Sequence, residues 1–198
     1  MIITIGRQHG SNGHLIAGGL AERLGYRCLD KEIVDRAAED SNFNKAILAS
    51  YDEKRISPYF SGSLQYMGGM GEGFRLSTQI AAAQFDAIRS LANEGNCIFV
   101  GRCADYVLRD MPNVVKVFIT ASMRSRIDKL LAQRSMTPQQ AKRYILQAEE
   151  KRASYYNYYT GKTWGAAESY DLCIDSSILG LEETEKLIAD FIRKQLDV

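Results

Sequence analysis

The feature that most constrains the fold is the alternation of short β-branched runs with longer helical patterns. Five apolar runs have the length of buried strands: Ile2–Gly6, Tyr26–Leu29, Cys97–Gly101, Val114–Thr120 and Tyr170–Asp175. The segments between and after them show helical spacing, at Leu15–Leu24, Lys31–Glu39, about Leu76–Asn93, Ser122–Arg134, Pro138–Tyr156 and Leu181–Leu196. Strands that alternate with helices of this length favour right-handed crossovers, so we expect a parallel sheet covered by helices on both faces.

Length and composition limit the class of protein. With 198 residues, 45% of them hydrophobic and 25% charged, the chain can form one globular domain without disulfides. Its 25 basic and 24 acidic side chains leave a net charge of +1, which disfavours nucleic acid and membrane surfaces as partners. No apolar run could span a membrane, no secretory leader is evident, and the four cysteines form no CxxC pair. We therefore expect a soluble, cytoplasmic protein.

The near-neutral total contains one basic segment. Residues 116–162 carry ten basic and three acidic side chains, whereas the segments before and after are net negative. Such a segment suits a small polyphosphate better than an extended polyanion.

A glycine-bearing turn joins the first strand to the first helix, and it reads Gly6-Arg7-Gln8-His9-Gly10-Ser11-Asn12-Gly13-His14. Backbone N–H groups in such a turn and at a helix N-terminus attract phosphate. A full Walker A pattern would add a lysine for the phosphates and a hydroxyl for Mg²⁺. If Gly10 is the mid-loop glycine, Gly13 and His14 occupy those two positions. By itself the turn fits a phosphate cradle and a plain strand–helix connection about equally.

Five blocks in chain order carry a family resemblance. They are the glycine turn, similar to [SG]-R-x-x-G-S-G-G-[RH]; Leu29–Arg36, similar to L-D-x-x-x-[IV]-x-R; Phe99–Leu108, similar to V-G-R-C-A-D-Y-[IV]-L; Val117–Arg126, similar to V-F-[IL]-x-A-x-x-x-R; and Lys151–Gly165, similar to K-R-x-x-Y-Y-x-x-Y-T-G-x-x-W-G. This ordered set resembles the cytidylate kinase-like branch of the P-loop nucleoside monophosphate kinases.

The resemblance implies a P-loop kinase fold with a five-stranded parallel sheet in one domain over residues 1–198. It implies a monophosphate-binding insertion at about 42–75, with a mobile loop or small helices, and a lid at about 149–165. The implied activity is transfer of the γ-phosphate of ATP, with Mg²⁺, to a nucleoside monophosphate such as CMP or dCMP. The implied partners are therefore small-molecule nucleotides; the oligomeric state is not indicated.

The resemblance also implies roles on the acceptor side and in catalysis. Arg36 and Arg102 would bind the acceptor phosphate, and Asp30 would contact its base or sugar. Arg102, Arg152 and Lys162 would act in phosphoryl transfer, because guanidinium and ammonium groups neutralise the moving charge. Structural alternatives stay open: Arg102 can form an ion pair with Asp30 or Asp105, and Asp30 can cap the helix that begins at Lys31.

On the donor side, the resemblance implies a set of nucleotide-binding residues in the turn and the basic segment. They are Gly10, Ser11, Asn12, Gly13, His14, Arg126 and Lys151. The turn departs from the family pattern at Asn12, where glycine is usual, and at His14, where arginine is frequent. Cys103 stands where cytidylate kinases carry aspartate, and no Mg²⁺ ligand is evident.

Three functions remain compatible with the sequence. The first is a kinase, the second a nucleotide-binding regulator that has lost turnover with the Walker lysine. The third is a partner-binding module whose surface is the aromatic stretch 42–73.

Overall fold

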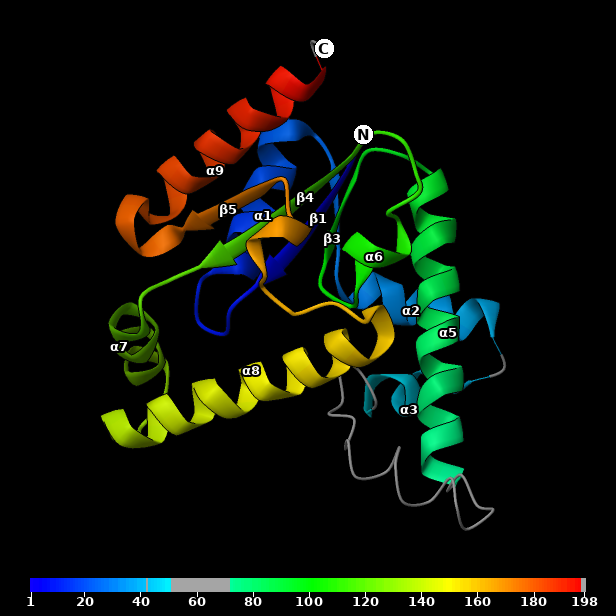
Figure 1. The fold of residues 1–198 in the computed structure, drawn as a ribbon, viewed down its shortest axis with the longest axis horizontal. Coiled ribbons are helices and arrows are strands. Elements are labelled where there is room, and N and C mark those ends of the chain that lie inside the picture. Colours follow the sequence, from blue (N-terminus) through cyan, green and yellow to red (C-terminus); the bar gives the residue numbers. More distant parts are fainter. Residues whose placement is uncertain (42, 51–71, 197–198) are drawn as a thin grey trace.

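The protein is described here from a computed structural model, which describes residues 1–41, 43–50 and 72–196. Within these ranges a five-stranded sheet occupies the middle of the molecule (Figure 1). Its strands are β1 (Ile2–Arg7), β2 (Arg27–Leu29), β3 (Cys97–Val100), β4 (Val114–Thr120) and β5 (Leu172–Asp175). All neighbouring strands run parallel, in the order β2-β3-β1-β4-β5. The predicted parallel sheet is confirmed.

Helices cover both faces of the sheet. They are α1 (Gly13–Leu24), α2 (Lys31–Asp40), α3 (Lys45–Ser50), α5 (Glu72–Asn93), α6 (Ala104–Val107), α7 (Met123–Gln133), α8 (Pro138–Thr160) and α9 (Ser176–Leu196). α9 is kinked at Gly180, whose φ of 77° and ψ of −179° are not helical. A short helical segment therefore precedes the kink, and the helix predicted from Leu181 follows it. The predicted insertion contains α3, and the rest of it, residues 51–71, lies outside the described ranges.

The alternation of side chains along the strands divides the core in two. Ile3 and Ile5 of β1 are fully buried against α1 and α9, with the odd-numbered residues of β4 on the same face. Ile2 points to the other face, where α2, α5 and α6 pack with Phe99. Because both faces are covered, the strands read as continuous apolar runs, which is why the sequence revealed them.

The long helix α8 runs past the carboxyl ends of the central strands (Figure 1). Its N-terminus is fixed by a capping box between Thr137 and Gln140. The first half packs Ile145 against α7, and the second half packs Tyr155 and Tyr156 against α5 and the turn after β3. Both tyrosines are buried. α8 is thus anchored at both ends above the edge of the sheet where ligands of parallel α/β proteins bind.

None of the helices in the described ranges combines the length and apolar character that a membrane crossing needs.

Candidate active site

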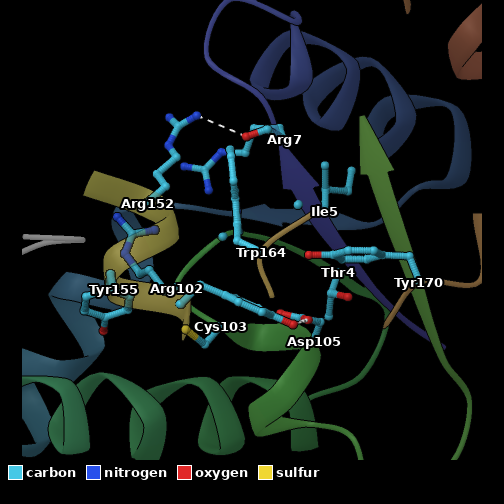
Figure 2. A pocket seen from close by; sticks show the side chains of 13 residues that line it. Thr4, Ile5, Arg7, Arg102, Cys103, Asp105, Arg152, Tyr155, Trp164 and Tyr170 are labelled. Carbon is cyan, nitrogen blue, oxygen red and sulfur yellow. Dashed lines mark hydrogen bonds between the residues drawn. The ribbon is translucent and has the colours of Figure 1, made fainter. Parts of the chain in front are cut away.

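A pocket lies where β1 and β3 end (Figure 2). Its walls come from β1, which ends at Arg7, from the turn after β3, from α8 and from the segment between α8 and β5. The sequence places these segments in three of the five motif blocks, and the fold brings them together.

Arg102 enters this pocket through an unusual backbone turn. Gly101, Arg102 and Cys103 have successive φ values of 78°, 52° and 56°. Residues with a Cβ rarely adopt this left-handed region, and each such residue costs on the order of 1 kcal/mol or more. The turn directs the Arg102 side chain inward, where it is only 4% exposed. Strain of this kind is typical of functional sites and persists only where the surrounding structure enforces it.

The buried guanidinium of Arg102 is paired with Asp30. Nη1 of Arg102 donates to Oδ1 of Asp30 at 2.6 Å, and Oδ2 of Asp30 lies 3.2 Å from Nδ1 of His14. Of the structural alternatives, the ion pair with Arg102 is observed and the helix cap is not: Asp30 precedes α2 but its side chain makes no capping hydrogen bond. The reason is that an ion-pair partner for a buried charge outweighs a cap at an exposed helix end. Asp30 therefore positions Arg102, and Asp105 does not take that role.

The glycine turn has the shape of a phosphate cradle with one inward-facing hydroxyl. Asn12 adopts the left-handed conformation, with φ 62°, that the usual glycine would provide. A Cβ on Gly13 would lie 2.5 Å from Cβ of Arg7, so only glycine allows this close approach. Ser11 is fully buried, and its hydroxyl donates to the carbonyl oxygen of Gln8 at 3.0 Å. Ser11 thus stabilises the turn and does not present a hydroxyl to a ligand.

Four arginines surround His9, a residue for which the sequence had suggested no role. Burial, as the largest cause, and the charges of Arg152, Arg134, Arg126 and Arg7, in that order, together lower the pKa of His9 from 6.5 to about 4. The His9 ring also makes an edge contact with Tyr144, with centroids 5.3 Å apart. His9 is therefore neutral at pH 7, inside a region of strong positive potential. Such a region attracts anionic groups.

Arg126 is the buried member of this cluster. It is 5% exposed, it pairs with Glu149 of α8, and Gly10 lies against its Cβ. Within the described part of the chain, Nε of Arg126 has no hydrogen-bond partner. A buried guanidinium N–H without an acceptor is costly, which favours a ligand oxygen at this position.

The segment predicted as a lid contributes Arg152 to the pocket. Its Nη1 donates to the carbonyl oxygen of Arg7 at 3.1 Å (Figure 2). Lys151 is exposed on α8, and Lys162 is exposed just after this helix. Burial raises the pKa of Asp105, and the charge of Lys162 is among the smaller influences that lower it. Lys162 thus lies on the pocket side, whereas nothing places Lys151 there.

The remaining predicted residues are not brought to the pocket. Arg36 faces α5, where its guanidinium donates to Glu94 at 2.7 Å and to Ser90 at 2.9 Å. These bonds with Glu94 raise the pKa of Arg36. His14 is 66% exposed and contacts Asp30, on the Arg102 side of the turn. The roles of Arg36 on an acceptor and of His14 on a donor remain predictions.

The residues of this site do not form a metal centre. Among the described residues, no three His, Cys, Asp or Glu side chains are grouped to hold an ion. Because the Ser11 hydroxyl is turned inward, the loop ligand that a Walker A motif provides is missing as well. The arrangement suits phosphate, which planar guanidinium groups and loop amides bind directly.

The fold is that of P-loop kinases such as shikimate kinase. A shikimate kinase structure from Bacteroides thetaiotaomicron superposes with a TM-score of 0.54 at 12% identity, covering 100% of this chain and 99% of that one. The similarity at this level concerns the fold alone.

The sequence profile of the cytidylate kinase-like family matches residues 2–178, and the chain belongs to that family. A cytidylate kinase from Methanothrix thermoacetophila is 28% identical over 176 residues, covering 89% of this chain and 88% of the relative. An uncharacterized protein from Eubacterium ventriosum superposes with a TM-score of 0.74 at 27% identity, covering 98% of both chains. The family and the fold agree on a phosphotransferase of the kinase class, as the motif blocks implied.

Proposed function

We propose that this protein transfers the γ-phosphate of ATP to a nucleoside monophosphate such as CMP or dCMP. The observation that carries the proposal is the convergence of Arg7, Arg102 and Arg152 around one pocket at the end of β1. The similarity to a cytidylate kinase supports a pyrimidine nucleotide as the acceptor.

The geometry meets the main demand of this reaction. Phosphoryl transfer needs two polyanions held in line and neutralised, and it needs little covalent help from the protein. The glycine turn and the first amides of α1 would hold the donor phosphates, since amides at a helix N-terminus have no partner within the helix. Arg126 and Arg152 would supply the positive charge that the missing Walker lysine provides elsewhere.

Arg102 would take the acceptor phosphate. Its pairing with Asp30 fixes the guanidinium in place, so little conformational entropy is lost when the phosphate binds. We propose segment 149–165 as the lid, because Arg152 reaches from α8 to the backbone of Arg7 and closes the pocket toward the donor side. Mg²⁺ would enter with the nucleotide, bound by phosphates and water, and no step here depends on a protein ligand for it.

The test is release of ADP from Mg²⁺-ATP by the purified chain, with CMP, dCMP, UMP or AMP as acceptor. We expect turnover that depends on CMP or dCMP and a low rate without an acceptor. Binding of ATP without turnover on any acceptor would instead favour a nucleotide-binding regulator. That outcome would fit the absence of the lysine and the inward-facing Ser11.

A pair of variants of α8 makes the test specific to the site. Arg152→Met should reduce kcat on the order of 100-fold, the usual effect of losing one group that stabilises transition-state charge. Arg143→Met is the matched control, because Arg143 is an exposed arginine nine residues earlier on the same helix, about 13 Å along its axis. Equal activity of the two variants would contradict the assignment of Arg152.

A further inference from the structure

The pocket has a polar floor beneath its arginines. Figure 2 shows Thr4, Asp105 and Tyr170 gathered on the side of Trp164 away from Arg7 and Arg152. Tyr156 of α8 belongs to the same group, because its hydroxyl donates a hydrogen bond to Asp105. These side chains take no part in the phosphate-binding roles described above.

Thr4 is a buried hydroxyl-bearing residue between the buried isoleucines of β1. The alternation of β1 places it with Ile2 and Gly6 on the face covered by α6, and it is 2% exposed. Among the described residues its Oγ1 atom has no hydrogen-bond partner. A buried hydroxyl without a partner destabilises a folded protein, so such a group needs an explanation. Valine would have the same shape without that cost.

The polar neighbours of Thr4 already form hydrogen bonds with one another. The Tyr156 hydroxyl donates to Oδ2 of Asp105 at 2.7 Å. The Tyr170 hydroxyl oxygen accepts from the backbone N–H of Gly165, and it also contacts Tyr156. Because the only hydroxyl hydrogen of Tyr156 goes to Asp105, the contact between the two tyrosines uses the hydroxyl hydrogen of Tyr170. The floor therefore presents the hydroxyl of Thr4 as an uncommitted donor beside the acceptor oxygens of Asp105.

The distribution of charge along the pocket favours one orientation of a bound nucleotide. Guanidinium groups line one end, and a carboxyl group with two hydroxyls lines the other. A phosphate is attracted to the first end and repelled by Asp105 at the second. The second end fits a small neutral group that both donates and accepts hydrogen bonds, such as a sugar hydroxyl or the amine of a base.

We propose that Thr4 and Asp105, with Tyr170 as a positioning residue, form a specificity subsite that binds a neutral donor–acceptor group of the acceptor nucleotide. This inference rests on the proposed function, because it takes the acceptor to be a nucleoside monophosphate whose phosphate lies on Arg102. The unpaired Thr4 hydroxyl is kept in the core because the bound acceptor completes its hydrogen bond.

Two conservative variants test the subsite. Thr4→Val removes the hydroxyl and keeps the shape, and Tyr170→Phe keeps the ring that packs on Phe118 at 4.8 Å. We expect Thr4→Val to lower kcat/KM for the preferred acceptor about 10-fold, mainly through KM, because a specific hydrogen bond is lost. Tyr170→Phe should have a smaller effect in the same direction, because it removes only the hydrogen bond that positions Tyr156 beside Asp105. KM for ATP should not change.

A stability measurement separates this role from a structural one. The matched control is Thr184→Val on α9, where the fully buried hydroxyl donates to the carbonyl oxygen of Gly180. In urea, Thr184→Val should lower the unfolding midpoint, whereas Thr4→Val should leave it unchanged or raise it. A fall in the Thr4→Val midpoint equal to that of the control would show a structural hydroxyl and overturn the inference.

The choice of acceptors identifies the bound group. If it is the ribose 2′-hydroxyl, Thr4→Val affects CMP and spares dCMP; if it is the base amine, both decline and UMP is spared. Unchanged kcat/KM for every acceptor would overturn the subsite and leave the proposed function standing. A wild-type protein that neither turns over nor binds any monophosphate by calorimetry would overturn both.

Discussion

The titration of His9 reports directly on the arginines that converge on the glycine turn. The perturbation is His9→Phe, which keeps an aromatic ring against Tyr144 and removes the titratable nitrogen atoms. In the folded protein burial and four guanidinium groups hold the pKa of His9 at about 4, against 6.5 in the unfolded chain. The unfolded state therefore binds the proton first as the pH falls.

The size of the effect follows from these two values. A depressed pKa stabilises the fold fully above pH 6.5, and this contribution is lost as the pH falls toward 4. Between pH 7 and pH 5 the loss amounts to about 2 kcal/mol of unfolding free energy. His9→Phe should lack this component, so the stability difference between wild type and variant should change by that amount over the same range.

Two measurements check the reasoning. Urea unfolding at pH 7, 6 and 5 gives the stability difference, and proton NMR gives the pKa directly because the chain has only two histidines. Bound ATP should raise the pKa of His9, since its phosphates offset the guanidinium charges. A His9 signal that titrates near 6.5, or a variant with the wild-type pH dependence of stability, would refute the arginine cluster.

Two further substitutions test the turn and the buried ion pair. Gly13→Ala places a Cβ 2.5 Å from Cβ of Arg7 and should abolish measurable turnover, whereas Gly18→Ala on the same helix meets nothing within 4 Å and should stabilise the protein by up to about 1 kcal/mol in thermal unfolding. Equal effects of the two alanines on turnover would contradict the close approach at the turn. Asp30→Asn leaves the buried Arg102 without its counter-charge and should cost about 3 kcal/mol in urea, partly restored by an added monophosphate. A loss of stability that the monophosphate does not reduce would argue against Arg102 as a phosphate ligand.

The sheet could be predicted from the sequence because its signal is local. Each buried strand has apolar side chains on both faces, so Ile2–Gly6 and Val114–Thr120 appear as continuous runs. The glycine-bearing turn after β1 could also be predicted from the sequence. In the structure Asn12, which stands where the family usually has glycine, adopts a left-handed conformation. The family resemblance rested on several such local blocks and is confirmed.

The side-chain partners could not be predicted, because they depend on contacts between distant segments. For Asp30 the sequence left both a helix cap and an ion pair with Arg102, 72 residues away, open, and only the structure shows that the ion pair forms. The same limit applies to Arg36, whose partner Glu94 is 58 residues away. Thr4 gave no signal, because threonine is common in strands and only the structure shows that its hydroxyl is unpaired.

Tracing the transferred phosphate tests the central claim most directly. The purified chain is incubated with ATP labelled at the γ-phosphate, Mg²⁺ and CMP, and the labelled products are separated. The account predicts labelled CDP in amounts equal to the ADP formed, and loss of this product in Arg152→Met but not in Arg143→Met. Label appearing only as inorganic phosphate, or remaining in ATP with every monophosphate offered, would contradict a nucleotide kinase.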